Sequence, residues 1–204
     1  MNATISKTTT QPANAGVWRP AVGLAAVSLL LFGFVYSMAG IGLGQLLFPA
    51  QANGSLLVQD GRVVGSALVA QPFTDVRYFA PRPSAAAFDP MAAAGSNQAR
   101  SNPALAERIA AETQRIALRE GIAPTAVPAD LVTQSGSGVD PDISPAAADV
   151  QIARVAHARG VPPAAVRSLV ERHTAQPTLG VLGEARVNVL ALNLALDRAF
   201  PRQP

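Results

Sequence analysis

The segment with the clearest capacity for chemistry is residues 131–145, which read LVTQSGSGVDPDISP. It is rich in hydroxyl groups and glycines, namely Thr133, Ser135, Gly136, Ser137 and Gly138. Ser144 can cap a helix whose N-terminus carries the positive end of the helix dipole, so the segment could hold an anion. It could equally be a tight connection into that helix, with the glycines permitting positive φ. The absence of Lys and Arg within the loop favours the second interpretation.

Two carboxylate pairs could in principle perform acid–base chemistry: Glu107 with Glu112, and Asp140 with Asp142. Glutamates on a helix surface are usually solvated. Aspartates beside Pro141 or near a helix start usually form turns and caps. We therefore interpret both pairs as structural.

Other catalytic and metal-binding constellations are excluded by residues that the chain lacks. It has no cysteine, and its one lysine is Lys7, which excludes a phosphate-binding G-x-x-x-x-G-K loop and a Schiff-base lysine in the folded domain. Ser137 has glycines immediately on both sides, so it does not form a G-x-S-x-G motif. The two histidines, His157 and His173, fall in or at the end of predicted helices and are not spaced as zinc ligands. We predict no catalytic residue, no metal site and no cofactor that the chain itself binds.

The charge pattern argues against nucleic acid as a partner. The sequence pI is about 10.2, yet 16 basic residues are scattered among 13 acidic ones for a net charge of +3. There is no run of five or more basic residues, and aromatic residues make up only 5% of the chain.

An apolar segment over residues 20–48 predicts a transmembrane helix. It contains no charged residue, and a helix needs about 20 apolar residues to cross a bilayer. Its Leu, Ile, Val and Phe residues contribute, as an upper bound, about −4 to −8 kcal/mol to insertion. Gly33, Gly40 and Gly44 would let a partner helix approach closely, or they could simply face lipid. The expected domains are a cytoplasmic tail over residues 1–19, the helix, and an extracytoplasmic domain over residues 49–204.

A cleaved signal peptide is the competing interpretation of this segment. Residues 50–52 (AQA) resemble a cleavage site, but the apolar stretch is about twice the length found in signal peptides. We therefore expect a retained anchor. Lys7 and Arg19 precede it and Arg62 follows it, so the positive-inside rule places the N-terminus in the cytoplasm.

Beyond the anchor, the pattern predicts one α+β domain that is mostly helical. Two β-favouring runs, residues 55–58 and 63–70, flank a turn at residues 59–61, and residues 80–102 form an ordered loop or a linker. Capping residues predict helices over residues 103–120, 145–159, 163–173 and 188–198.

Short motifs along the chain resemble the C subunit of the bacterial Kdp-type potassium-transporting P-type ATPase. They are residues 51–57 (QANGSLL), 65–68 (GSAL), 78–79 (YF), 82–85 (RPSA), 95–97 (GSN), 101–103 (SNP), 131–145, 154–156 (RVA), 187–190 (VNVL) and 192–197 (LNLALD). The chain departs from the family pattern at Gln134, Val139 and Ala185, and residues 1 to about 17 form an extension.

The resemblance implies a non-catalytic accessory subunit of a high-affinity, ATP-driven potassium uptake complex in the bacterial inner membrane. Its expected partners are a channel-like potassium-translocating subunit, an ATP-hydrolysing P-type pump subunit, and a further small membrane subunit. Potassium is the transported ion, and ATP is implied because the family's C subunit is described as a catalytic chaperone that raises the pump's ATP affinity. The alternative is an independent, membrane-anchored periplasmic protein that binds a small ligand.

The motifs also supply candidate contact residues. We predict that partner binding involves Tyr78, Arg82, Ser84, Asn97, Asn188 and Asn193. The residues from Thr133 to Asp140 could bind nucleotide or a partner. An extracytoplasmic loop has no ATP supply, and the adjacent Asp140 and Asp142 would repel a polyanion. We therefore expect a rigid turn that docks on the channel-like subunit.

Overall fold

The computed structural model of the protein describes residues 16–201, which form two compact units that divide after Asn53. The first unit is helical. The second combines helices with two small sheets, so the α+β fold class is confirmed.

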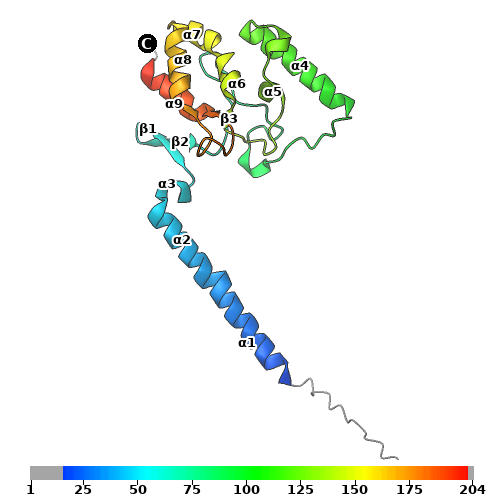
Figure 1. Ribbon diagram of the computed structural model, residues 1–204, viewed down its shortest axis with the longest axis vertical. Helices are drawn as coiled ribbons and strands as arrows, with labels where there is room; N and C mark the ends of the chain where they lie inside the picture. The colour runs from blue at the N-terminus through cyan, green and yellow to red at the C-terminus, as the bar shows by residue number, and fades with distance from the viewer. Residues whose placement is uncertain (1–15, 202–204) are drawn as a thin grey trace, which may run out of the picture. The chain divides into compact units, whose positions relative to one another are not determined.

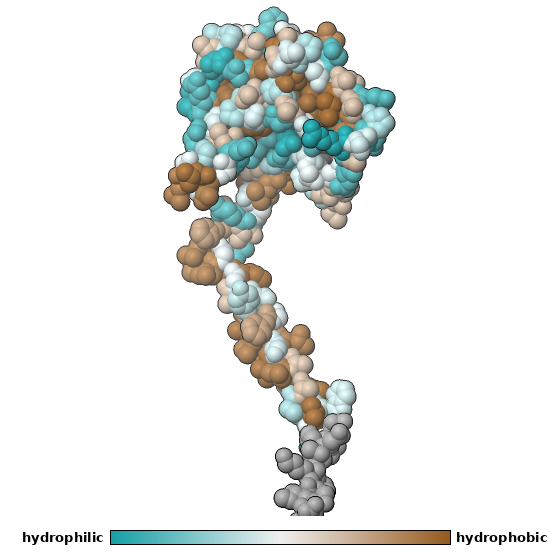
Figure 2. All heavy atoms as spheres, turned by 45° about the vertical axis from the view of Figure 1, so that its right-hand side comes forward, coloured by the Kyte–Doolittle hydropathy of each residue, from teal (hydrophilic) through white to brown (hydrophobic). Residues whose placement is uncertain are grey.

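The first unit is a long apolar helix. It comprises α1 (Trp18–Ser28), a π-helical stretch η2 (Leu29–Val35) and α2 (Tyr36–Leu47), followed by the short α3 (Pro49–Ala52) (Figure 1). The 30 residues from Trp18 to Leu47 span about 45 Å at 1.5 Å per residue, which exceeds the roughly 30 Å of a bilayer's hydrocarbon core. Strongly hydrophobic residues recur along this helix with no strongly hydrophilic patch between them, whereas the surface of the second unit is mixed (Figure 2). Among the described residues, it is the one helix long and apolar enough to cross a membrane.

A β-hairpin opens the second unit. Strand β1 (Leu56–Gln59) pairs antiparallel with β2 (Arg62–Ser66), and Asp60 and Gly61 both have positive φ, as a two-residue type I′ turn requires. The second strand was expected to reach residue 70, but β2 ends at Ser66, so the prediction was wrong at that end. Because β1 has only four residues, the chain beyond Ser66 has no strand to pair with, and the backbone N–H of Ala70 instead donates to Val139.

The longest helix of this unit, α4 (Pro103–Glu120), confirms the prediction from its capping residues. The side chain of Asn102 accepts a hydrogen bond from the Ala104 backbone at 3.0 Å, and Gly121 ends the helix with φ +67°. Before it lies the 3₁₀ turn η3 (Pro90–Ala92). After it come η4 (Pro124–Ala126) and the short α5 (Ala129–Val132).

The helix expected over residues 145–159 is two helices, α6 (Pro145–Asp149) and α7 (Ile152–Arg159). The side-chain amide of Gln151 donates to the Ala147 carbonyl at 3.1 Å, the acceptor that the Gln151 backbone would use in a continuous helix. Its backbone N–H donates instead to Ala148, which breaks the ladder. The sequence pattern did not show this competition.

The last elements match their predicted positions. Helix α8 (Pro163–Arg172) ends one residue before the expected His173, and α9 (Val189–Ala199) starts after the Asn188 cap. The sequence analysis missed a three-stranded sheet. Its order is β3 (Asp142–Ile143), β5 (Arg186–Asn188) and β4 (Thr174–Ala175), all antiparallel. Strands β4 and β5 lie between α8 and α9 in the chain, and β3 lies before α6.

The core of this unit joins residues from across its length. Helix α4 lies on one side, while α7, α8 and α9 gather on the other (Figure 1). The largest fully buried apolar side chains are Phe79, Ile116, Leu131, Leu192, Leu196, Val155, Val166, Val187 and Val189. Phe79 lies in a segment without regular structure, so this segment must be fixed by something other than a backbone ladder.

Candidate functional site

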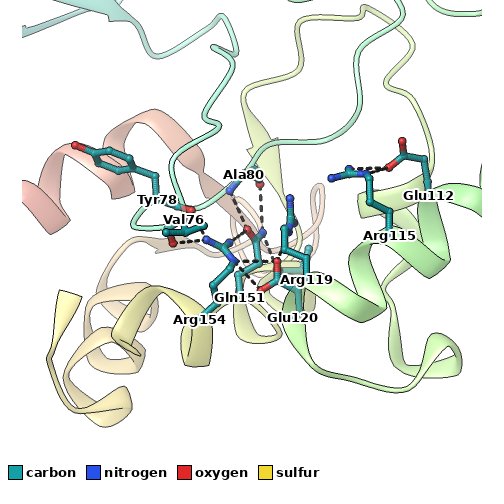
Figure 3. Close-up of polar contacts among 10 residues, drawn as sticks. Val76, Tyr78, Ala80, Glu112, Arg115, Arg119, Glu120, Gln151 and Arg154 are labelled. Carbon is teal, nitrogen blue, oxygen red and sulfur yellow. Dashed lines mark hydrogen bonds and ion pairs between the residues drawn. The ribbon is translucent and has the colours of Figure 1, made fainter. Parts of the chain in front are cut away.

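Residues 76–84, here called the strap, carry three of the predicted contact residues and are held by side chains from distant helices. Arg154 on α7 donates to the carbonyls of Val76 and Tyr78, the latter at 2.9 Å. Figure 3 shows Arg154 and Gln151 both reaching the strap from the same side. Because the strap lacks a strand partner, these contacts satisfy carbonyl groups that strand pairing would otherwise satisfy.

The positive charge of Arg154 is balanced by Glu120, the last residue of α4. The Glu120 side chain is fully buried and contacts Arg154 at 2.9 Å and Arg119 at 2.6 Å (Figure 3). Burial lowers the pKa of Arg119, and the Glu120 carboxylate opposes this shift. The cluster therefore joins α4, α7 and the strap through buried charge.

Two buried amide side chains form hydrogen bonds with the backbone of the strap at Phe79 and Ala80. Asn193 on α9 is 1% exposed. It accepts from the backbone N–H of Phe79 and donates to its carbonyl, each at 2.9 Å. Gln151 makes the same pair of contacts with Ala80, accepting at 2.8 Å and donating at 3.2 Å. Each amide thus replaces the neighbouring strand that the strap lacks.

Tyr78 is held at the other edge. Its hydroxyl donates to Asp197 at 2.8 Å, and the guanidinium of Arg159 lies 4.9 Å from the centre of its ring. Arg159 also pairs with Asp197 at 2.9 Å and donates to the carbonyl of Arg77. The predicted contact residue Tyr78 is therefore part of an internal cluster with α7 and α9.

The glycine loop, residues 133–140, packs directly against the strap. The Ser84 hydroxyl donates to the carbonyl of Gly138, and the Ser135 backbone N–H donates to Pro83 at 3.3 Å. Arg82 forms an ion pair with Asp140 at 2.9 Å. The structure thus brings together two segments that the sequence analysis singled out separately.

Gly138 shows why this loop needs glycine. Its φ is +72°, and an added Cβ would lie 2.6 Å from the Ala94 carbonyl oxygen and 2.8 Å from the Ala86 Cβ. Gly136 faces open space, although a Cβ on the opposing Gly95 would come within 2.9 Å of the Gly136 carbonyl oxygen. The loop and residues 86–95 are in close backbone contact.

In a ligand-binding site the hydroxyl groups would point toward one place. In this loop two of them bond to nearby backbone groups instead. Thr133, just after α5, donates to the Ala129 carbonyl at the start of that helix, and Ser137 accepts from the Val139 backbone at 3.2 Å. Ser135 is 3% exposed, and its carbonyl accepts from the Gly138 backbone. These contacts describe a compact turn, in keeping with the structural interpretation of the loop.

A shallow cavity of about 290 Å³ adjoins the acidic end of the glycine loop. Its charged lining residues are Asp130, Asp140, Asp142, Glu184, Arg82 and Arg186. Asp142 accepts from Asn188 at 3.1 Å and pairs with Arg186 at 3.1 Å. Burial raises the pKa of the Asp142 carboxyl, while Asn188 and Arg186 oppose the rise.

The remaining predicted site residues lie apart from this cluster or serve it as caps. Asn188 caps α9 by accepting from the Ala191 backbone at 3.0 Å, and it also donates to the Ala67 carbonyl. Asn97 is exposed with φ +52°. Gly33, Gly40 and Gly44 lie in the first unit, where an added Cβ would meet nothing within 4 Å of the chain.

The sequence analysis missed three side chains that contact the strap, Gln151, Arg154 and Arg159. It also missed Glu120, which pairs with Arg154. One signal was present. Gln151 lies four residues before Val155 on the inner face of the predicted helix, where a polar residue implies a buried hydrogen-bond partner. Nothing in the spacing indicated that the partner would be the backbone of residue 80.

Comparison with known proteins gives a consistent result. The family described as KdpC, "K+-transporting ATPase, c chain", matches residues 18–198. A protein of Xanthomonas campestris pv. campestris (strain B100) named potassium-transporting ATPase KdpC subunit is 60% identical over 90% of this chain and 88% of its own length. Proteins of the same name from Gemmatimonas aurantiaca and Shewanella putrefaciens are 53% and 48% identical, over 91% and 97% of this chain and 94% and 97% of their own lengths.

Proposed function

The chain belongs to the KdpC family of potassium-transporting ATPase c chains, and from this membership we propose how it acts within its complex. It is an accessory subunit of the Kdp potassium-transporting ATPase and is not catalytic itself. Among the described residues, the buried charged and amide side chains contact backbone groups or one another, which fits a scaffold. The alternative of an independent ligand-binding protein is not favoured.

The glycine loop is proposed to dock on the channel-like, potassium-translocating subunit. The observation that carries this proposal is the position of the loop on the strap, which is itself fixed by α4, α7 and α9. A loop fixed in this way loses little conformational freedom on binding. The tuning of the ATP-hydrolysing subunit, including any rise in its ATP affinity, would then be transmitted through the assembled complex. A further small membrane subunit completes the proposed set of partners.

Direct contact between the loop and ATP is not part of this proposal. The cavity beside the loop has four carboxyl groups and two guanidinium groups in its lining. Both guanidinium groups are already paired, Arg82 with Asp140 and Arg186 with Asp142. A triphosphate would meet net negative charge there, which opposes its binding. Potassium is the ion that the complex transports, and no contact of this subunit with it is proposed.

The first test of the proposal is copurification. A tagged chain isolated from potassium-starved membranes is expected to bring down a channel-like subunit and a P-type ATPase subunit. Recovery without large polytopic partners would contradict the accessory role.

A second test separates docking from nucleotide binding. The double substitution Ser135→Ala and Ser137→Ala should reduce subunit retention in the complex or potassium transport. The purified chain should bind no ATP with or without the substitutions. Thr113→Ala is the matched hydroxyl control, because Thr113 is half-buried on α4 and its hydroxyl donates within that helix, to the Ile109 carbonyl. Micromolar ATP binding that the double substitution abolishes would show that the loop is a nucleotide site.

The orientation is also proposed rather than established. We propose that the N-terminus lies in the cytoplasm and that the unit from Gly54 onward lies in the periplasm. Lys7 ahead of the apolar helix and Arg19 in its first turn, against Arg62 after it, support this arrangement.

A further inference from the structure

A cleft of about 470 Å³ lies between α4 and the strap. Its wall comprises strap residues 80–84, residues 72–74 just before the strap, Phe88 just after it, part of α4, and Leu131 of α5. A concave site of this size, with apolar walls and a few polar groups, is the usual form of a small-molecule site. The cleft is distinct from the shallow acidic cavity beside the glycine loop, although Arg82 lines both.

Most of the wall of this cleft is apolar. The buried Ile116 and Leu131 contribute to it, together with the half-buried rings of Phe73 and Phe88. Aromatic surface that is still open to water gains free energy when an apolar group covers it. The cleft therefore favours a ligand with an apolar body, such as a ring.

Phe88 is held in this wall by a strained turn. Its φ is +63° and that of the preceding Ala87 is +51°, a left-handed conformation that is unfavourable for residues with a side chain. The Ser84 hydroxyl fixes the turn by accepting from the Ala86 N–H at 3.0 Å and from the Phe88 N–H at 2.9 Å. Backbone strain of this kind tends to occur at functional sites, including ligand clamps.

The polar part of the wall carries a positive net charge. It holds the guanidinium groups of Arg82, Arg115 and Arg119, against the one carboxylate of Glu112. Arg115 and Glu112 pair at 2.7 Å. The lining as a whole therefore attracts an anion.

Arg119 has donors to offer to such an anion. Its Nε contacts Glu120 at 2.6 Å, whereas neither terminal nitrogen has a hydrogen-bond partner among the described residues. Arg115 lies one turn earlier on α4, and Figure 3 shows both side chains between α4 and the strap. Burial lowers the pKa of Arg119, and the like charges of Arg154 and Arg115 add to this shift. A bound anion would oppose it.

We propose that this cleft binds a small organic acid, with its carboxylate on Arg115 and Arg119 and its apolar body against Phe73 and Phe88. A guanidinium group can donate to both oxygens of one carboxylate, which gives the ligand a fixed orientation. Glu112 in the same wall disfavours polyanions such as triphosphates. The proposal does not depend on the docking role of the glycine loop or on the side of the membrane.

Ligand-observed fluorine NMR on the detergent-solubilised full chain tests this assignment. The probe is para-fluorobenzoate, and its controls are the uncharged para-fluorobenzamide and empty detergent micelles. We expect saturable binding of the benzoate to the chain and about 10-fold weaker binding of the benzamide, because the amide cannot form a charge-assisted pair with an arginine. Equal binding of the two probes, or no saturable binding of the benzoate, would overturn the proposal.

A matched pair of arginine substitutions tests where the carboxylate binds. Arg115→Gln should weaken benzoate binding about 10-fold, whereas Arg167→Gln on α8 should leave it unchanged. The two arginines are comparable, since each pairs with a carboxylate and their side chains are 56% and 52% exposed. Natural affinity in the Arg115→Gln variant would contradict the proposed site.

A pair of glycine substitutions tests the apolar part of the cleft. Phe88→Gly removes the ring and relieves its positive φ, and it should weaken benzoate binding about 10-fold. Ala87→Gly relieves the same kind of strain without removing a ring, so it should leave the affinity unchanged. Urea midpoints from pulse proteolysis report whether each variant is folded. Natural affinity in folded Phe88→Gly, or equal loss in both variants, would refute the role of the ring.

Discussion

In most α+β domains, pairing with a neighbouring strand satisfies the backbone hydrogen bonds of an extended segment. In this protein individual polar side chains do so for the strap. Asn193 and Gln151 each bond both backbone groups of one strap residue, and Arg154 and Arg159 take further strap carbonyls. A buried backbone group without a partner costs about 1–3 kcal/mol. Each of these side chains is therefore tied to the stability of the strap and of the glycine loop that packs on it.

The buried charge of Glu120 provides the sharpest test at this scale. Glu120→Gln removes the negative charge between Arg119 and Arg154, and breaking a buried ion pair from one side typically costs about 3–5 kcal/mol. Pulse proteolysis of the detergent-solubilised chain in increasing urea should show this fall in the free energy of unfolding. Glu112→Gln on the same helix is the control. Its partner Arg115 is 56% exposed, so a change of at most about 1 kcal/mol is expected. Equal effects of the two substitutions would contradict the assigned role of Glu120.

Asp142 predicts a dependence of stability on pH. Its pKa is raised in the folded state, so the folded chain binds a proton at higher pH than the unfolded chain does. The contribution of Asp142 to stability therefore falls as pH rises from the ordinary carboxyl range near 4 through the raised value. Asp142→Asn removes this titration, so the variant should gain stability relative to the natural chain over that interval. Urea midpoints measured from pH 4 to pH 7 would show the difference, and a constant difference would exclude it.

Among the helices and strands, the sequence predicted those whose ends are marked by capping or turn residues. Asn102 and Gly121 marked both ends of α4, and Asp60 with Gly61 marked the hairpin turn. The break between α6 and α7 was missed because it arises from a side chain that competes for a backbone acceptor. The three-stranded sheet was missed because its strands have two or three residues, too few to show alternation.

The candidate site was likewise predicted only where neighbouring residues gave a signal. Its glycine loop was visible in the composition of residues 131–145, and Arg82 and Asp140 were both singled out. Their pairing was not visible, because they are 58 positions apart in the chain. The side chains that fix the strap lie 71 to 119 residues away from it in the chain. Contacts between such distant residues leave no recognisable spacing in a single sequence.

Close packing of the glycine loop gives a prediction at this scale. Gly138→Ala forces an unfavourable positive φ and places a methyl group 2.6 Å from a carbonyl oxygen, so it should lower the free energy of unfolding by about 1–3 kcal/mol. It should also weaken retention in the complex. Gly136→Ala has open space and no positive φ, and it should leave both measurements near their natural values. Loss of retention from Gly136→Ala alone would show that the loop binds through its exposed side and not through its fixed shape.

For the whole molecule, the absence of cysteine allows a direct test of orientation. A single cysteine introduced at Leu118, an exposed position of α4, should react with a membrane-impermeant maleimide in intact cells with a permeable outer membrane. A cysteine at Ser6, on the other side of the apolar helix in the sequence, should react only after the inner membrane is opened. The reverse labelling pattern would place the larger unit in the cytoplasm and contradict the proposed topology.

The fixing of the strap by α9 also has a consequence for biosynthesis. The ribosome makes the strap well before Asn193 and Asp197, which hold Phe79 and Tyr78 from 114 and 119 positions further along the chain. A nascent chain therefore cannot close its larger unit until α9 has been made. Premature termination before α9 would leave Phe79 and its backbone groups without their contacts. Such fragments should be substrates for quality-control proteases, so that only chains that include α9 would persist to join the complex.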